Sequence, residues 1–190
     1  GLDICVVSYR TPEYLDRFLK SVQEFPAHRQ KTFLRVNELS SEDADVISDR
    51  NYGIHHVEHG DNLGYSLSIN RLASYGESDI IGVFNADVAV DSNVLQRCCD
   101  ALRSNPDWGV LGPRSMDSSG RITHAGIFGT NANPEHRGWK KRDSSSFHDI
   151  KEAVTVSGSA YFIKRSVWEE LTFCPKYMDA CYGIYEEKER

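Results

Sequence analysis

Short apolar runs alternate with amphipathic segments along the first 113 residues of the chain. The run DIIGVF (79–84) is nearly all apolar, which is typical of a strand that helices cover on both faces. We expect it to be the central strand of a sheet. Further strands are expected at ICVVSY (4–9), TFLRVNEL (32–39), GIHHVEH (53–59) and WGVLGP (108–113). This order predicts an α/β fold with an open, mostly parallel twisted sheet and helices on both faces.

The segments between these strands carry the 3.6-residue apolar spacing of helices. Thr11 and Pro12 are suited to begin the first helix. Its apolar stripe is formed by Leu15, Phe18, Leu19 and Val22. A second helix is expected over residues 67–76, closing on Gly76, and Asp91 is suited to cap a third. The stripe of the third helix comprises Val94, Leu95, Cys98 and Leu102.

The chain has 190 residues, the length of one large domain. Its 28 acidic residues outnumber its 22 basic ones, so it lacks the basic excess of a nucleic-acid-binding protein. No apolar run approaches the roughly 20 residues that cross a bilayer, and the first ten residues do not resemble a signal peptide. We therefore expect a cytoplasmic protein with no transmembrane segment and no nucleic-acid partner.

The cysteines are odd in number and show neither a CxxC pair nor His partners at zinc spacing. We expect them to be reduced and structural. They are Cys5, Cys98, Cys99, Cys174 and Cys181.

Residues 129–149 form a polar stretch rich in Gly, Ser and Asn, longer than an ordinary connection. Too little chain follows it for a second core, so we expect a single domain over residues 1–190. Within that domain, residues 129–149 are predicted to be a mobile active-site loop. The charged run at residues 182–190 leads us to expect that the natural chain continues past Arg190.

The segment FNADV (84–88) places Asn85 and Asp87 directly after the central strand. In open α/β sheets, ligands bind beyond the carboxyl ends of the strands. One carboxylate with a neutral oxygen neighbour suits Mg2+ or Mn2+, which takes its other ligands from substrate phosphates and water. The same residues could simply turn the chain, with Asp91 capping the next helix. The segment alone leaves both interpretations open.

Six segments stand in a fixed order along nearly the whole chain. They are VVSYR (6–10), DNLGYSLSINR (61–71), FNADV (84–88), THAGIFG (123–129), SGSAYFIKRSVWEEL (157–171) and YGIYEEKER (182–190). Together they resemble the inverting glycosyltransferases of family 2, which have the GT-A fold. Two segments depart from the family pattern. VNELSSED (36–43) stands where the family has an Asp-rich segment, and the acidic pair is Glu186-Glu187 where the family has Glu-Asp.

The resemblance implies transfer of a sugar from a nucleotide-diphosphate donor, linked to UDP, GDP or TDP, to a hydroxyl of an acceptor carbohydrate or other molecule. It also implies Mn2+ or Mg2+ as cofactor. Asp87 would bind the metal, and His124 would be a further metal ligand or an acceptor contact. The residues implied for donor binding are Ser8, Tyr9, Arg10, Asn37, Glu38, Asn62, Asn70, Arg71 and Asn85.

An acceptor hydroxyl must lose its proton when it attacks, which requires a positioned carboxylate. The resemblance implies Glu187 for this role, with Glu186 beside it. A charged run such as EEKER also occurs on ordinary exposed helices, and that interpretation stays open. His136, Trp139 and Gly158 are expected to face the acceptor or the loop.

Two other classes of protein were weighed against a glycosyltransferase. A nucleotidyltransferase normally has a Gly-rich phosphate loop after its first strand, and SYRTPEY (8–14) contains no Gly. A sugar-nucleotide-binding module without catalysis remains an alternative, because Asn85, the altered end of the second strand and Glu187 each weaken the family pattern.

Overall fold

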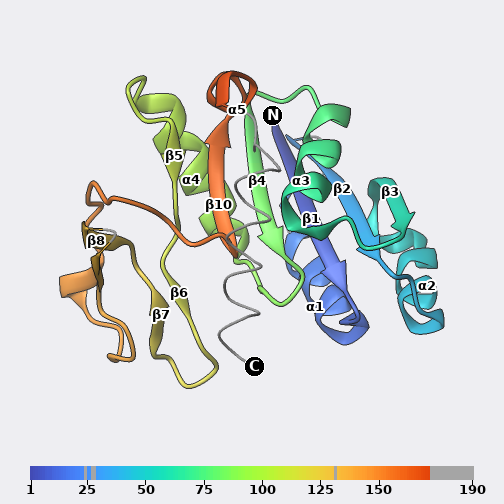
Figure 1. The fold of residues 1–190 in the computed structure, drawn as a ribbon, viewed down its shortest axis with the longest axis horizontal. Coiled ribbons are helices and arrows are strands. Elements are labelled where there is room, and N and C mark those ends of the chain that lie inside the picture. Colours follow the sequence, from blue (N-terminus) through green and yellow to red (C-terminus); the bar gives the residue numbers. More distant parts are fainter. Residues whose placement is uncertain (24, 27–28, 131, 172–190) are drawn as a thin grey trace.

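The computed structural model describes residues 1–23, 25–26, 29–130 and 132–171. Its centre is a six-stranded sheet in the order β3-β2-β1-β4-β10-β5 (Figure 1). The strands are β1 (Leu2–Tyr9), β2 (Gln30–Asn37), β3 (Ile54–Gly60), β4 (Ile80–Asn85), β5 (Val110–Leu111) and β10 (Ala160–Lys164). β1 to β4 pair in parallel, and β10 runs antiparallel to both of its neighbours. The expected α/β fold with a mostly parallel sheet and a central β4 is confirmed.

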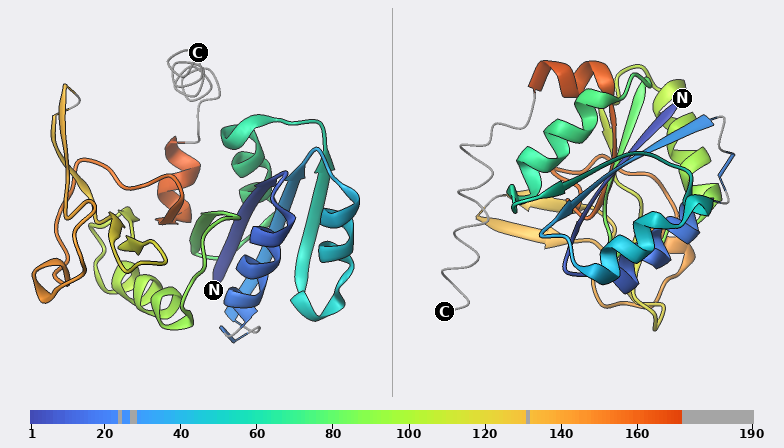
Figure 2. Two further views of the ribbon diagram at one scale, coloured as in Figure 1. Left: turned by 90° about the horizontal axis from the view of Figure 1, so that it is seen from below. Right: turned by 90° about the vertical axis from the view of Figure 1, so that its right-hand side faces the viewer.

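Helices cover both faces of this sheet, as Figure 2 shows. They are α1 (Pro12–Gln23), α2 (Ser41–Ser48), α3 (Gly64–Tyr75), α4 (Ser92–Ser104) and α5 (Arg165–Leu171). α1, α2 and α4 share one apolar cluster with the sheet, whereas α3 and α5 share the other. None of the described helices is long and apolar enough to span a bilayer.

Which side chains are buried in the core follows from the periods at which side chains share one face, two residues in a strand and about 3.6 in a helix. Ile4 of β1 belongs to the cluster beneath α1, and its neighbour Cys5 belongs to the cluster beneath α3. The predicted stripe of α1 is buried in full. The Phe84 ring lies 5.6 Å from the rings of both Phe18 and Phe162, so β4 and β10 are joined to α1 by aromatic contacts.

Two helix ends agree with the sequence analysis. Asp91 caps α4 by accepting a hydrogen bond from the Asn93 amide at 2.7 Å, and α3 ends before Gly76. In α4 the predicted stripe is buried except for Val94, which is partly buried. Cys5, Cys98 and Cys99 are buried free thiols, as expected. Cys174 and Cys181 lie outside the described residues.

α2 was not predicted from the sequence, and the predicted ends of β2 and β5 were wrong. β2 stops at Asn37 because Glu38 takes a left-handed conformation (φ 56°) and Ser40 begins α2. Ser40 and Asp43 form a capping box, in which each side chain accepts a hydrogen bond from the other residue's backbone amide. β5 is shorter than expected and keeps only Val110 and Leu111.

Beyond β5 the chain forms two small antiparallel pairs beside the main sheet. The pairs are β6 (Ser115–Met116) with β7 (Ile122–His124), and β8 (Ile127–Thr130) with β9 (Asn133–His136). A short 3-10 helix, η3 (Ser145–Phe147), lies within the predicted loop 129–149, and another, η2 (Arg50–Tyr52), precedes β3. Within the loop, Arg137 donates hydrogen bonds to the carbonyls of Ser146 and Asp149, each 3.0 Å long. Its mobility stays a prediction.

Candidate functional site

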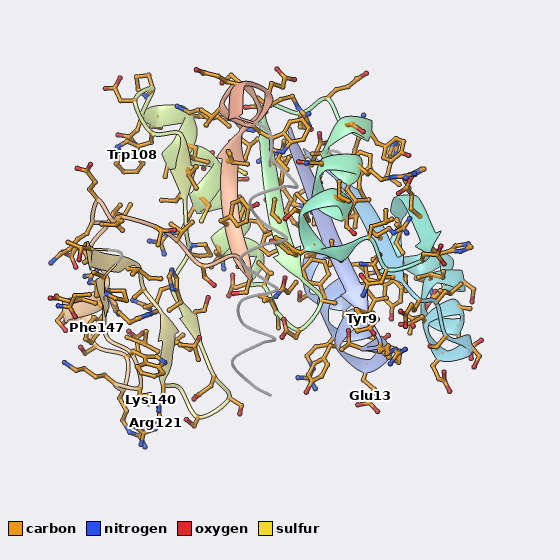
Figure 3. All side chains as sticks on the ribbon, in the orientation of Figure 1. Tyr9, Glu13, Trp108, Arg121, Lys140 and Phe147 are labelled. Carbon is orange, nitrogen blue, oxygen red and sulfur yellow. The ribbon has the colours of Figure 1, made fainter. Side chains whose placement is uncertain are left out.

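The carboxyl ends of the four parallel strands meet at one edge of the sheet. In the strand register Tyr9 lies opposite Asn37, Val7 opposite Asn85, and Asn37 opposite Gly60. Figure 3 shows Tyr9 at this edge, where β1 ends. The structure therefore brings most of the predicted donor and metal residues to one edge. They are Ser8, Tyr9, Arg10, Asn37, Glu38, Asn62, Asn85 and Asp87.

The turn after β4 is built by the backbone and leaves the Asp87 side chain free. The Ala86 amide donates to the Val7 carbonyl at 3.3 Å, and the Val88 amide donates to the Asn85 carbonyl at 3.4 Å. The Asp87 carboxylate is exposed and has no hydrogen bond or ion pair with any described residue. The segment is thus a turn, as one interpretation held, but neither the turn nor the α4 cap uses this carboxylate.

The donor set at this edge fits a cation that shares its ligands with a phosphate group. Within residues 1–171, as far as the structure describes them, no three His, Cys, Asp or Glu side chains gather closely enough to hold a metal alone. Mg2+ and Mn2+ commonly take one or two protein carboxylates and complete their coordination from substrate oxygens and water. Asp87, with the Asn85 amide two residues before it, meets that need.

His124 ends β7 and is buried, with 7% of its surface exposed. Its Nε2 accepts hydrogen bonds from the Ser157 amide at 2.9 Å and the Gly126 amide at 3.3 Å. This requires the neutral imidazole with its hydrogen on Nδ1. Burial, helped by the charge of His136, lowers the pKa of His124 and favours that form. Its Nε2 lone pair is engaged by the protein's own backbone.

Residues 157–159 connect three elements at the site. The Asn85 amide donates to the Ser159 carbonyl at 2.9 Å, and the Tyr65 hydroxyl donates to the Gly158 carbonyl at 2.5 Å. The Ser157 amide reaches His124, as described above. Gly158 itself is exposed. The sequence pattern SGS indicated Gly158, but nothing in it indicated that these backbone groups join β4, α3 and β7.

Asn37 is buried in a polar network at the end of β2, with 2% of its surface exposed. Its Oδ1 accepts from Nε of Arg35 at 3.0 Å, and its Nδ2 donates to the Ser68 hydroxyl at 3.3 Å. Arg35 also donates to the Asp61 carbonyl at 2.7 Å. The Leu63 amide donates to Oδ1 of Asn37 at 3.4 Å, so Arg35 and Asn37 both contact the turn after β3. Asn62 helps to shape the same turn, because its Oδ1 accepts from the Gly64 amide at 2.8 Å.

Tyr9, Arg10 and Glu38 form an exposed group beside this network. Arg10 and Glu38 both have left-handed backbones, with φ of 54° and 56°. Their side chains form an ion pair of 2.5 Å, and the Arg10 guanidinium lies 5.0 Å from the Tyr9 ring centre. The hydrogen bond to Glu38, and then its charge, raise the pKa of Arg10. Non-glycine residues in this strained conformation are concentrated at functional sites.

Arg71 and Asn70 lie on α3, and the structure pairs Arg71 with β3. Its Nη2 lies 2.8 Å from Oε1 of Glu58, which also accepts from the Tyr75 hydroxyl. Burial alone would raise the pKa of Glu58, but Arg71, Tyr75 and the charge of Arg35 together lower it. Arg71 is thus tied to Glu58. Asn70 is partly buried.

The remaining predicted residues lie on the loop, at the end of β1, or outside the described residues. His136 and Trp139 lie together on the loop, with 5.8 Å between their ring centres, and Trp139 is 55% exposed. Ser8 is buried at the end of β1, with its hydroxyl 3.2 Å from that of Thr11. Glu186 and Glu187 lie outside the described residues, so their catalytic role stays a prediction.

Comparisons with known proteins agree with this fold. The chain resembles S. aureus TarS 1-349, with a TM-score of 0.65 at 12% identity over 90% of this chain and 48% of that chain. It resembles the same protein in complex with UDP-GlcNAc, with a TM-score of 0.66 at 12% identity over 90% and 47% of the two chains. It also resembles the mannosyltransferase PcManGT from Pyrobaculum calidifontis in complex with GDP-Man and Mn2+, with a TM-score of 0.62 at 12% identity over 90% and 46%.

The chain spans about half the length of these structures, and at 12% identity the likeness shows the fold. No curated protein sequence matches the chain significantly. The sequence model described as "Glycosyl transferase family 2" matches residues 3–170. That range includes nearly all of β1 and the whole of the other five strands of the central sheet. The chain therefore belongs to glycosyl transferase family 2.

Proposed function

We propose that this chain binds a nucleotide-diphosphate sugar at the carboxyl edge of its sheet and transfers the sugar to an acceptor hydroxyl. The observation that carries the proposal is the exposed Asp87 carboxylate directly after β4, which has no hydrogen-bond or ion-pair partner in the part of the chain that the structure describes. It lies beside the polar ends of β1 and β2, where open α/β sheets bind ligands. Membership of glycosyl transferase family 2 supports the same reaction class.

The nucleotide would lie along the end of β1. Tyr9, which is 42% exposed, offers a ring face to the base or ribose. Arg10 can donate to diphosphate oxygens, a geometry that suits a guanidinium. UDP, GDP and TDP remain the candidates, and the similar structures contain two of these nucleotides, as UDP-GlcNAc in TarS and GDP-Man in PcManGT.

Asp87 would hold Mn2+ or Mg2+ together with the diphosphate, and the Asn85 amide would hydrogen-bond the ribose or a metal-bound water. The cation supplies Lewis-acid stabilisation of the charge that develops on the leaving diphosphate. Support for it comes from the donor set at the end of β4 and from the Mn2+ in the PcManGT structure. His124 is less suited to this metal, because its Nε2 accepts two backbone hydrogen bonds.

The reaction would be a single displacement that inverts the anomeric carbon. The acceptor hydroxyl attacks from the face opposite the diphosphate, and a carboxylate takes its proton. Glu187, with Glu186 beside it, is proposed as that base on the resemblance of the segment YGIYEEKER alone. Residues 129–149 would exclude water from the donor, since they lie beside β7 and carry the exposed Trp139.

Nucleotide release separates a transferase from a non-catalytic binding module. UDP, GDP and TDP sugars are incubated with Mn2+, with and without a panel of acceptor oligosaccharides, and the released nucleotide is measured. A transferase releases nucleotide faster when an acceptor is present, and Asp87→Ala lowers kcat/KM by at least about a hundredfold. Glu187→Gln should lower kcat while nucleotide binding persists. Donor binding without release under any condition would support the binding module instead.

A further inference from the structure

Four basic side chains gather at one tip of the molecule, where the start of β7 pairs with residues 140–142. This cationic tip consists of Arg121, Lys140, Lys141 and Arg142, all exposed. None of them forms an ion pair with a carboxylate of the described residues. Figure 3 shows Lys140 and Arg121 together at this tip. In a chain with a formal net charge of -6, such a local excess of positive charge suits an anionic ligand.

Hydrogen bonds hold together the two backbone segments that carry these side chains. The Lys140 amide donates to the Ile122 carbonyl at 2.8 Å, and the Ile122 amide donates to the Lys141 carbonyl at 2.9 Å. The Arg121 guanidinium donates to the Lys140 carbonyl at 2.9 Å. Lys140 has a left-handed backbone with φ of 62°, which disfavours a lysine. The tip thus keeps a lysine at a strained position, as functional sites often do.

Trp139 adds an aromatic surface to the cationic tip. Its ring is 55% exposed, and the Lys140 ammonium lies 4.4 Å from the ring centre. An exposed indole offers an apolar face to the C–H side of a sugar ring. A cation beside it would contact a charged group on that sugar or on its neighbour. The combination suits a ligand that is both saccharide and anion.

We propose that the cationic tip and Trp139 bind the acceptor, and that this acceptor is a glycan carrying anionic groups. The inference rests on the proposed function, whose acceptor class it names. The tip is joined to the donor site through β7, which begins directly after Arg121 and ends at His124, about 10 Å from Arg121 at 3.3 Å per residue. His124 accepts a hydrogen bond from the Ser157 amide, and two residues later the Ser159 carbonyl accepts one from the Asn85 amide of the donor site.

An anionic membrane surface fits the tip less well. Interfacial binding needs several apolar side chains that enter the bilayer beside the cations. The large exposed apolar side chains here are Trp139 and, on the neighbouring β6, Met116. Two such side chains provide a small insertion surface, and the Lys140 ammonium lies over the ring of one of them.

The test measures binding of an oligogalacturonate, a sugar chain with carboxylates, to the full chain in the absence of donor. A neutral maltooligosaccharide of equal length, inorganic polyphosphate, and vesicles of phosphatidylcholine with phosphatidylserine are the comparison probes. The variants are Lys140→Gln with Lys141→Gln, and Trp139→Ala. The matched control is Arg17→Gln with Lys31→Gln, which removes the same charge from two exposed residues outside the tip.

The inference predicts that the oligogalacturonate binds and the maltooligosaccharide does not. The Lys140/Lys141 variant should weaken this binding by about tenfold, since each exposed ion pair contributes up to ~1 kcal/mol. The control pair should change it by less than about twofold, because salt screens distant charges. Trp139→Ala should weaken binding of the oligogalacturonate but not of polyphosphate.

Three results would overturn the inference. The first is an equal loss of oligogalacturonate affinity in the Arg17/Lys31 control, and the second is tighter binding of the parent to the vesicles than to the oligogalacturonate. The third is that polyphosphate binds as tightly as the oligogalacturonate and Trp139→Ala changes neither affinity. Failure of the proposed function is distinguishable from these results. If the parent binds nucleotide but does not bind oligogalacturonate, the acceptor inference fails and the proposed function stands. If oligogalacturonate binds and no nucleotide does, the function falls and the glycan surface stands.

Discussion

Nε2 of His124 accepts a hydrogen bond from the Ser157 amide at 2.9 Å, so a side chain at the end of β7 fixes the backbone that leads into β10. Two residues later, the Ser159 carbonyl accepts from the Asn85 amide at 2.9 Å. Two hydrogen bonds therefore connect the neutral His124 side chain, through residues 157–159, to the end of β4 that precedes Asp87. This arrangement makes the stability of the site depend on pH.

The folded protein should lose stability as the pH falls below about 6.5, the ordinary pKa of histidine. Folding lowers the pKa of His124, so the unfolded chain binds a proton at a higher pH than the folded chain does. The stabilisation is complete above the unfolded pKa and decreases as the pH falls toward the lower, folded pKa. Thermal melts at pH 7.5 to 5 measure it, with on the order of 1 kcal/mol lost per unit of pKa difference.

His124→Gln is the variant that isolates this effect, because a glutamine oxygen can still accept from the Ser157 amide but does not titrate. It should fold and show a flatter pH profile than the parent. His59→Gln removes an exposed histidine from β3 and should leave the profile unchanged. An equal flattening in both variants would show that His124 is not the titrating group.

Asn37→Ala should destabilise the fold by about 1–3 kcal/mol, because it leaves the buried Arg35 and Ser68 without this hydrogen-bond partner. Urea unfolding measures the loss. Asn62→Ala is a useful comparison, because Asn62 is exposed and its side chain forms one hydrogen bond among the described residues, to the Gly64 amide. This variant should cost less than about 1 kcal/mol. Equal costs would mean that the network around Asn37 contributes little.

Glu38→Gln should change ligand binding more than stability. The Arg10–Glu38 pair is exposed, so its loss should alter the free energy of unfolding by less than about 1 kcal/mol. Removing the carboxylate frees the Arg10 guanidinium and lowers the repulsion of a diphosphate, so nucleotide affinity should rise several-fold at low salt. Titration calorimetry measures this. Glu77→Gln, on the loop before β4, is the control and should leave affinity unchanged.

Asp91→Ala should separate the two roles that the segment after β4 could serve. Loss of the hydrogen bond to the Asn93 amide should cost about 1 kcal/mol of stability through α4. Nucleotide binding should persist, because the Asp91 carboxylate is committed to the helix. If Asp91→Ala kept the melting temperature of the parent but no longer bound nucleotide, Asp91 rather than Asp87 would be the residue that serves the nucleotide site.

The sheet and its main helices could be predicted because their apolar residues repeat with the periods of strands and helices. The stripe of α1 and the apolar run of β4 both became buried as expected. α2 was not predicted because its apolar residues Val46 and Ile47 are adjacent and do not repeat at helical spacing. In the structure both are only partly buried. The capping box at Ser40 and Asp43 was the signal that could have found it.

The site could be predicted only in part. The fold determines which strand ends meet at one edge of the sheet, but it does not determine which side chains pair there. His124 and Ser157 are 33 residues apart in sequence, and no local pattern indicates their contact. The pairing of Arg71 with Glu58 likewise depends on how α3 packs beside β3. Asp87 could be named from sequence because it directly follows the most apolar strand.

The most direct test of the account is a thermal-shift panel of UDP, GDP and TDP, each with and without Mn2+, on the parent and on Asp87→Ala. A ligand that binds only the folded state stabilises it by about 2.7 kcal/mol at a hundred times its Kd, roughly 5 to 10 °C in Tm for a chain of this size. We predict that one nucleotide stabilises the parent only with Mn2+, and that this shift in Tm vanishes in Asp87→Ala. If no nucleotide shifts the parent with or without the metal, or if Asp87→Ala responds as the parent does, the proposed site is contradicted.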